Sequence, residues 1–204
     1  KLICTLAKEI DSNPKIREKL SVVFLEDYRV TLSELLMPAS EVSEQISLAG
    51  TEASGTGNMK LMLNGAVTLG TMDGANIEIG EAVGPENIIT FGMTAEEVSE
   101  LKAQGYHPQQ IYQNNPAVKA AVDMLTNGIG GERFDEIANQ LKSRDTYMAL
   151  ADFDSYREAQ ARVSALYRDP LKFAEVSLNN IAGAGIFSAD RAIQEYAHNI
   201  WHLD

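Results

Sequence analysis

Three short, mainly apolar runs, separated by segments of helical pattern, constrain the fold of this chain most. They are Val22–Leu25, Ala66–Thr71 and Asn87–Gly92. A strand with one solvated face alternates apolar and polar residues, whereas a continuous apolar run is typical of a strand buried on both faces of a parallel sheet. Strands that alternate with helices therefore predict an α/β fold with a parallel sheet.

The segments between these runs have different patterns. Residues 1–20 have the pattern of a helix that ends near Asn13 and Pro14, followed by a turn or a second short helical piece. Residues 41–47 fit a short helix or a strand equally well, because periodicity does not separate the two over so short a segment. The composition of Asp73–Asn76 predicts a turn.

After Gly92 the pattern is helical to the end of the chain. Thr94 and Glu97 have the spacing of a capping box, which predicts a helix that starts there. We expect the last helix to begin at Ser188 and to carry one apolar face, with Trp201 as an apolar anchor. The apolar residues of that face are Ile193, Tyr196, Ala197, Ile200 and Trp201.

The length and the charge of the chain bound its organisation and its partners. A chain of 204 residues is long enough for one sizeable domain and hardly for two, so we expect residues 1–92 and 93–204 to be an α/β segment and a mainly helical segment of one domain. The formal net charge of −12 would repel nucleic acid and anionic lipid, whereas neutral sugars are compatible with it. No apolar run approaches the roughly 20 residues of a membrane-spanning helix.

Cysteine and histidine give little reason to expect a disulfide or a metal site. Cys4 is the only cysteine, which excludes an internal disulfide and favours a reducing compartment, so we expect a cytoplasmic protein. His198 and His202 have a spacing that can bind a metal ion, but no third ligand lies nearby in the sequence. We therefore expect two solvent-facing histidines and no metal.

The segment from Gly50 to Gly65 carries the most chemical information. It predicts a loop of small residues that leads into a helix of about two turns. Gly55 and Gly57 would let the backbone approach a ligand closely, and the first N–H groups of the helix favour an anion, above all a phosphate. Neither a P-loop nor a dinucleotide fingerprint fits, since Asn58 follows Gly57 where a P-loop needs lysine, and Lys60 occupies the place of the third glycine.

The position of Lys60 adds a second element to this phosphate loop. A cation in the first turn faces the positive end of the helix dipole, and this favours the neutral amine that condenses with an aldehyde. A lysine one turn beyond a phosphate-binding loop could hold a phosphorylated aldehyde at both ends, and pyridoxal phosphate is such a molecule. The alternative is a glycine-rich turn with Lys60 pointing into water.

The residues of this segment resemble a known motif. The stretch Glu52–Lys60, continued by Asn64 and Gly65, is similar to the cofactor-lysine motif of the α-glucan phosphorylases, which act on glycogen, starch or maltodextrin. The similarity extends over nearly the whole chain. It includes Phe24–Val30, Gly70–Glu78, Arg162–Tyr167 and Phe187–Arg191.

The resemblance implies a fold, a reaction and a set of site residues. It implies part of a Rossmann-like parallel-sheet domain, the C-terminal half of a two-domain GT-B fold. It also implies transfer of the terminal glucose of an α-1,4-glucan to orthophosphate, giving α-D-glucose 1-phosphate with retention, with pyridoxal phosphate as the cofactor. Lys60 would be the Schiff-base lysine. Thr56, Gly57, Tyr28 and Arg29 would bind the cofactor, with Arg29 also near the reacting phosphate, and Glu52, Ser54 and Gly55 would bind the sugar.

The resemblance also implies that the domain seen here is partial. The basic residues that grip the substrate phosphate, and much of the sugar site, would lie upstream of this sequence. We therefore expect the isolated chain to lack activity and to expose a sheet edge and apolar surface, which favours self-association. Full-length family members are commonly homodimers.

Two other functions stay open on the residues alone. One is a catalytically silent module that binds a sugar phosphate or another anion through the Gly55–Gly57 loop. The other is an unrelated pyridoxal enzyme that acts on amino acids, which would need an acidic partner for the pyridine nitrogen and an arginine for the substrate carboxylate. A Schiff base absorbs in the near ultraviolet or visible, and an empty anion site does not.

Overall fold

The computed structural model describes residues 1–203, which group into two compact units. The first unit consists of Lys1–Val30 and Gly105–Phe153, and the second consists of Thr31–Gln104 and the chain from Asp154 onward. Each unit is therefore assembled from two separate stretches of the sequence. The expected single partial domain, with its change of character at residue 92, stays a prediction.

The first unit is helical. It contains α1 (Leu2–Ser12), α2 (Pro14–Arg17), α7 (Pro108–Asn114), α8 (Pro116–Asn127), α9 (Asp135–Ser143) and the start of α10 (Ala149–Tyr167). Prolines at the first positions of α2, α7 and α8 start these helices, because a proline there loses no helical hydrogen bond. The prediction of a helix that ends near Asn13, with a second helical piece after it, is confirmed. Buried side chains of α8, α9 and α10 form the core, namely Val118, Val122, Ala138 and Leu150.

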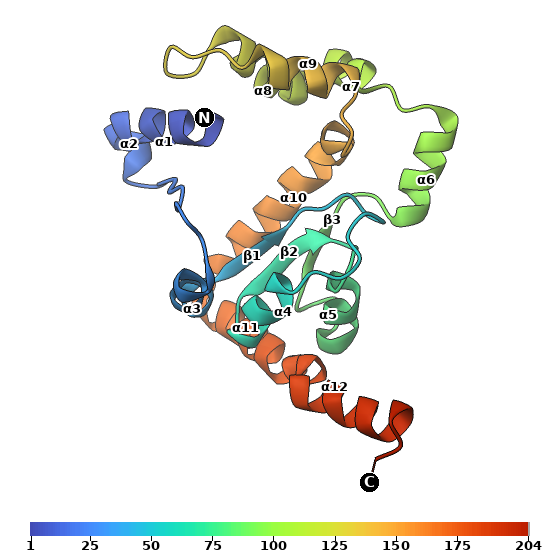
Figure 1. Ribbon diagram of the computed structural model, residues 1–204. Coiled ribbons are helices and arrows are strands. Elements are labelled where there is room, and N and C mark those ends of the chain that lie inside the picture. Colours follow the sequence, from blue (N-terminus) through green and yellow to red (C-terminus); the bar gives the residue numbers. More distant parts are fainter. Residues whose placement is uncertain (204) are drawn as a thin grey trace. The chain divides into compact units, whose positions relative to one another are not determined.

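The second unit contains a parallel sheet of three strands (Figure 1). The strands are β1 (Val42–Gln45), β2 (Val67–Thr71) and β3 (Ile89–Phe91), in that order, with Val42 beside Val67 and Leu69 beside Ile89. All residues of β2 are buried, as its continuous apolar run predicts. The predicted strands at Ala66–Thr71 and Asn87–Gly92 are confirmed. The segment 41–47, for which helix and strand were equally compatible, contains the strand β1. The α/β prediction with a parallel sheet is confirmed.

Helices cover the two faces of this sheet. The connections between the strands contain α4 (Gly57–Leu63) and α5 (Asn76–Val83), which lie on one side with α11 (Pro170–Gly183) and the 3-10 helix η1 (Ala184–Phe187). On this side Met62, Ile79, Ile88 and Ala184 form one buried cluster. On the other side the later part of α10 places Ala159 against Leu69, Ile89 and Phe91. Alternate residues of the strands thus meet different helix layers.

The remaining helices agree in part with the sequence patterns. They are α3 (Val30–Ala39), α6 (Ala95–Gln104), α12 (Ala189–Glu195) and a π-helical turn, η2 (Tyr196–Ile200). The predicted capping box before α6 is confirmed, because the Thr94 N–H donates to Glu97 Oε2 at 2.7 Å and the Glu97 N–H donates to Thr94 Oγ1 at 3.2 Å. Ser188 is the N-cap residue of α12, as predicted.

The prediction of a buried strand at Val22–Leu25 is wrong. This segment forms neither helix nor strand, and Val23, Phe24 and Leu25 are 71%, 57% and 41% exposed. An apolar run indicates that a segment favours burial, but a strand also needs a neighbour to accept its hydrogen bonds. No described strand pairs with this segment.

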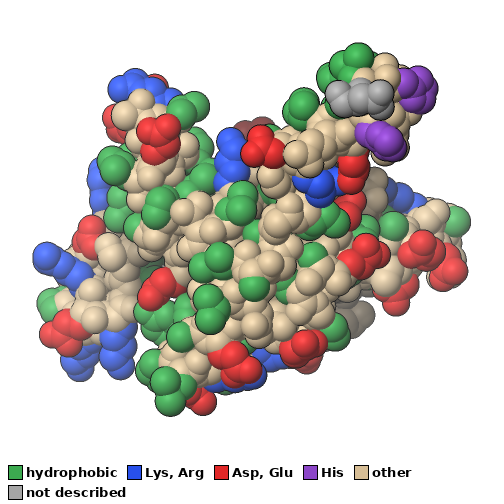
Figure 2. All heavy atoms as spheres, turned by 90° about the horizontal axis from the view of Figure 1, so that it is seen from below, with side chains coloured by type: hydrophobic (Ala, Val, Ile, Leu, Met, Phe, Trp, Pro, Cys, Tyr) green, Lys and Arg blue, Asp and Glu red, His purple; other side chains and the backbone are tan. Residues whose placement is uncertain are grey.

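The interpretation of Trp201 as an apolar anchor is also wrong for the described part of the chain. Trp201 is 54% exposed, and its ring centroid lies 6.1 Å from that of Tyr196, which is itself half-exposed. The helix α12 ends at Glu195 and Tyr196–Ile200 form a π-helical turn, so the predicted apolar face does not lie on one α-helix, and no described element covers its exposed residues. Exposed apolar side chains are visible on the face of the molecule shown in Figure 2. None of the described helices is both long and apolar enough to cross a membrane.

Candidate functional site

The segment Gly50–Gly65 folds as the sequence predicts, into a loop followed by a short helix. The helix α4 begins at Gly57, with Thr56 at its N-cap, and ends at Leu63. It closes at Gly65, whose φ of +85° is in the left-handed region. A Cβ at Gly65 would lie 2.6 Å from Ser177 Oγ, so only glycine fits between α4 and α11.

The loop presents backbone donors that the protein does not use. Within the described chain, the N–H groups of Gly55, Thr56 and Gly57 donate no hydrogen bond. Gly55 has a φ of +81°, which suits glycine, but Gly57 has no such angle, and a Cβ there would meet nothing within 4 Å. The contacts of this protein with itself therefore do not explain the glycine at 57. An approaching ligand would explain it.

A buried carboxylate holds the first half of the loop. Ser47 Oγ and the Glu52 N–H donate to Asp73 Oδ2 at 2.7 and 2.9 Å, and the Gly50 N–H donates to Asp73 Oδ1 at 2.8 Å. We call these four residues the Asp73 cluster. Burial alone would raise the pKa of the Asp73 carboxyl, but the hydrogen bonds from these donors outweigh burial and hold the pKa below its ordinary value of 3.8.

We expect the order of this loop to depend on pH through Asp73. Because its folded-state pKa is depressed, its stabilising contribution is complete above 3.8 and is lost as the pH falls through the folded-state pKa. Hydrogen exchange of the peptide that contains Gly50 and Glu52 measures this. At pH 6 we expect stronger protection in the wild type than in Asp73→Asn, and a shrinking difference below the pKa. If the difference in protection between the wild type and Asp73→Asn were the same at pH 6 and below the folded-state pKa, the assignment would be contradicted.

A second buried group holds the start of α4. The Asn76 side chain donates through Nδ2 to the Thr71 carbonyl at 2.9 Å and accepts through Oδ1 from Asn58 Nδ2 at 3.0 Å. We call these three residues the Asn76 cluster. Asn58 and Asn76 are 3% and 2% exposed, so these amide contacts are shielded from water. The cluster joins the end of β2 to the starts of α4 and α5.

The turn after β2 also packs directly on the loop. The Ala75 N–H donates to the Ser54 carbonyl at 2.7 Å. Gly74, with a φ of +50°, lies so close that a Cβ would be 2.4 Å from the Ser54 oxygen. The loop is therefore supported along its length by the carboxyl end of β2, which is where parallel sheets commonly bind ligands.

The structure brings most of the predicted site residues together because they share this loop and helix. Lys60 is the fourth residue of α4 and lies in its last turn, so the expected position in the first turn, at the positive end of the helix dipole, is wrong. Its side chain is exposed, and no described residue forms an ion pair with it. Tyr28 and Arg29 belong to the first unit, so their distance from the loop is not defined. The Arg29 guanidinium donates a hydrogen bond to the Asp27 carboxylate. The residues of the loop and helix are Glu52, Ser54, Gly55, Thr56, Gly57 and Lys60.

Sequence reasoning missed the residues that support the loop. Asp73, Asn76 and Asn58 lie in the segments that carry the resemblance, but Asp73 and Asn76 were otherwise predicted only as turn formers and Asn58 only as a residue that excludes a P-loop. A signal for Asp73 and Asn76 was present, since polar residues directly after a buried parallel strand lie at the ligand-binding edge of the sheet. The sequence gives no comparable signal that Asn58 pairs with Asn76, because this contact forms only when the loop folds back.

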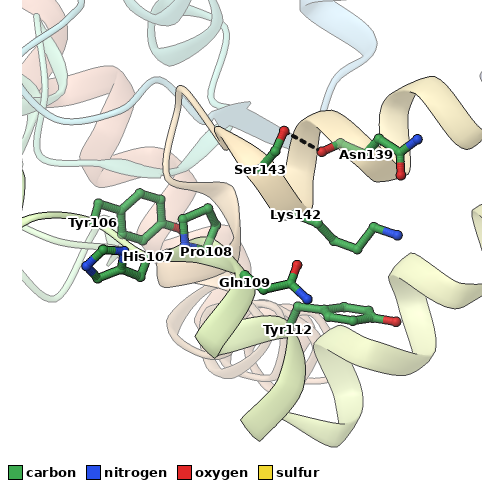
Figure 3. Close-up of a pocket in the computed structure, with 8 residues that line it drawn as sticks. All are labelled: Tyr106, His107, Pro108, Gln109, Tyr112, Asn139, Lys142 and Ser143. Carbon is green, nitrogen blue, oxygen red and sulfur yellow. Dashed lines mark hydrogen bonds between the residues drawn. The ribbon is translucent and has the colours of Figure 1, made fainter.

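A separate pocket of about 770 Å³ lies in the first unit, between the start of α7 and the end of α9 (Figure 3). The Tyr106 hydroxyl donates to Asp145 Oδ2 at 2.6 Å, and burial together with this bond raises the pKa of Tyr106, so the phenol stays protonated. The Lys142 ammonium lies 5.5 Å from the ring centroid of Tyr112. No acidic side chain and no predicted site residue line this pocket, so we do not assign the chemistry of the loop to it.

The prediction that His198 and His202 share the last helix is wrong, because η2 ends at Ile200 and His202 lies beyond it with a φ of +52°. Both His198 and His202 are exposed, as expected, and a ring nitrogen of His202 lies 3.2 Å from the backbone oxygen of His198. Among residues 1–203, no group of three or more His, Cys, Asp or Glu side chains could hold a metal ion.

Comparison with known proteins gives consistent results. The family model described as carbohydrate phosphorylase matches residues 1–203. The chain is 46% identical to human liver glycogen phosphorylase and 45% identical to the bovine muscle form, each over 208 aligned positions that include 100% of the chain. It is 45% identical to the bovine brain form over 98% of its length. These matches cover 25%, 25% and 24% of the relatives, so the chain spans about a quarter of their length.

Proposed function

Because this chain belongs to the carbohydrate phosphorylase family, we propose that the protein containing it is a glycogen or α-1,4-glucan phosphorylase. The full-length protein would transfer the terminal glucose unit of the glucan to orthophosphate and release α-D-glucose 1-phosphate with retained configuration. The chain would supply the cofactor-binding part of the site. Since it spans about a quarter of its relatives, we expect it to be inactive alone.

The loop and α4 would hold pyridoxal 5'-phosphate at two points. The backbone N–H groups of Thr56 and Gly57 would bind its phosphate, and Lys60 Nζ would attach it covalently. When bound, the cofactor would supply a phosphate group that exchanges protons with the substrate phosphate. The fit of the residues rests on their chemistry, because a phosphate favours free N–H donors at a helix start and an exposed amine is accessible to an aldehyde.

The first half of the loop would bind the sugar. The Glu52 carboxylate would accept hydrogen bonds from glucose hydroxyls, the Ser54 hydroxyl would add a polar contact, and the Gly55 N–H would donate one. Tyr28 and Arg29 would line the cofactor and phosphate region. A guanidinium is suited to phosphate because its donors match two oxygens at once.

One observation carries this proposal beyond the family match. Three consecutive N–H groups lack an acceptor in the described chain, and one of them belongs to Gly57, whose missing side chain faces open space. Where the backbone angle also suits alanine, as at Gly57, glycine is less favourable than alanine by about 0.4–1 kcal/mol. No contact within the described chain requires glycine at position 57. A bound phosphate that closely approaches this backbone would require it.

The wider assembly follows from the family and stays part of the proposal. The sheet of the second unit would belong to a Rossmann-like domain, the C-terminal half of a two-domain GT-B fold. The open edge of β1 would then pair with strands outside this sequence. We propose a cytoplasmic enzyme that acts as a homodimer.

Chemical trapping of the cofactor tests the proposal directly. The full-length protein is incubated with pyridoxal phosphate, reduced with borohydride and digested, and the adduct is mapped by peptide mass. We expect the label on Lys60 and its loss in Lys60→Ala, whereas Lys142→Ala should keep it. Absence of a label at Lys60 in the full-length protein would reject the cofactor role and leave a silent anion-binding loop.

Substitution of Gly57 distinguishes an effect on cofactor binding from an effect on the stability of the fold. In Gly57→Ala we expect a helix stabilised by up to about 1 kcal/mol, because the new Cβ meets nothing and alanine favours helix. Cofactor affinity should fall by about tenfold or more, as the methyl group occupies the space of the phosphate. Thermal unfolding and cofactor titration measure the two effects. Unchanged affinity would show that no ligand closely approaches Gly57.

A further inference from the structure

The Asp73 cluster uses the two oxygens of one carboxylate for three donors. The backbone N–H groups of Gly50 and Glu52 bond different oxygens, at 2.8 and 2.9 Å, and Ser47 Oγ shares Oδ2 at 2.7 Å. An asparagine in place of Asp73 has only one oxygen. Whichever way its amide turns, its NH₂ group faces either the Gly50 N–H or the Glu52 N–H, and that N–H loses its acceptor.

The Asn76 cluster contacts a different part of the same segment. Its contact with the Gly50–Gly65 segment is made by Asn58, which is the second residue of α4. The Asn58 side chain also lies beneath Gly55, because a Cβ at Gly55 would be 3.2 Å from Asn58 Oδ1. Asn58 directly follows Gly57, so its buried side chain fixes the start of α4, where the Thr56 and Gly57 donors lie. Its contact with Gly55 lies where the two halves of the loop meet.

No side chain of one cluster bonds a side chain of the other, although Thr71 Oγ1 of the Asn76 cluster donates to the Ser47 carbonyl at 2.7 Å. Asp73 accepts from residues 47–52, and Asn76 bonds Thr71 and Asn58. Both are buried, at 4% and 2% exposure, and both follow β2 directly. The residues that follow this buried strand thus contact the loop at two separate places.

We infer that Asp73 and Asn76 are positioning residues with separate tasks in the proposed site. Asp73 fixes the segment that carries Glu52 and thereby orients the sugar-binding half. Asn76 fixes Asn58 and thereby orients the phosphate-binding half. This division rests on the proposed function, since it assigns sugar to one half of the loop and cofactor to the other.

Two variants of the full-length protein test the division. In Asp73→Asn we expect the KM for glucan to rise about tenfold or more, with the Kd for pyridoxal phosphate within about twofold of the wild type, because only the first half of the loop loses a hydrogen bond. In Asn58→Ala we expect the reverse, a Kd raised about tenfold and a KM for glucan, at saturating cofactor, within about twofold of the wild type.

Matched substitutions control for the chemistry of each change. Asp135→Asn and Asn139→Ala make the same replacements on α9 in the first unit and should alter neither constant. Ser47→Ala removes one donor but leaves the Gly50 and Glu52 bonds intact, so its KM should lie between those of the wild type and Asp73→Asn. The melting temperature of each variant is measured in parallel, and only variants folded at the assay temperature are compared.

The outcomes separate the inference from the proposed function. If each variant changes both constants by the same factor, or if only the melting temperature falls, the separate tasks are disproved. If the wild-type protein neither binds the cofactor nor cleaves glucan with phosphate, the proposed function fails first. A double separation, with KM changed by one variant and Kd by the other, supports the inference.

Discussion

Replacement of Lys60 by alanine in the full-length protein is expected to lower phosphorolysis of glucan on the order of a thousandfold or more, since covalent attachment holds the cofactor in place at a high effective concentration. Lys60 is exposed, forms no ion pair with a described residue and lies in a helix of seven residues. Its loss should therefore leave the fold intact. Release of glucose 1-phosphate, measured with excess cofactor, gives the result.

Two further lysine variants make this prediction specific. Lys60→Arg keeps the positive charge but cannot attach an aldehyde as lysine does, so it should be as inactive as the alanine variant. Lys142→Ala removes a lysine from α9 in the first unit and should keep its activity. Activity in Lys60→Arg close to the wild type would show that Lys60 acts as a simple cation, against the proposed role.

The parts of the fold that local patterns specify were predicted well. The buried strand β2, the loop before α4 and the capping box at Thr94 each depend on neighbouring residues in the sequence, and each is found. Such features need only local propensity and a hydrophobic pattern. The composition of the Gly50–Gly65 segment likewise predicted a loop followed by a short helix, and the roles of its residues stay predictions.

Burial that depends on distant parts of the protein was predicted poorly. Val22–Leu25 and the face around Trp201 have the composition of buried segments, yet both are exposed in the described chain. The composition of a segment indicates that it favours an apolar environment, but it does not indicate which part of the protein will cover it.

The supporting residues of the site illustrate a different limit. Asp73 and Asn58 bond residues about 20 positions away in the sequence, with separations of 21 to 26 for Asp73 and 18 for Asn58. No local pattern encodes such pairs, since their geometry depends on how β2 lies beside the loop. Turn composition predicted where the chain reverses. Only the folded chain shows from which donors the turn residues accept hydrogen bonds.

Gly74→Ala is expected to destabilise the second unit by about 2–5 kcal/mol, because it combines a left-handed backbone angle with a steric clash. Gly74 has a φ of +50°, and the new Cβ would lie 2.4 Å from the Ser54 carbonyl oxygen. The Ser54 oxygen is a backbone atom and the position of the new Cβ is fixed by the Gly74 backbone, so no side-chain rotation can relieve the clash. Either the turn or the loop must move, and the Ala75 N–H to Ser54 oxygen bond of 2.7 Å would break.

Gly131→Ala provides the matched control, since it isolates the backbone angle. Gly131 has a φ of +77°, but a Cβ there would meet nothing within 4 Å, so its replacement should cost only about 1–2 kcal/mol. Hydrogen exchange of the peptides that contain Ser54 and Gly131 measures the two effects locally. We expect a larger loss of protection around Ser54 in Gly74→Ala, accompanied by a raised KM for glucan. Equal losses in the two variants would show that the turn after β2 does not set the position of the loop.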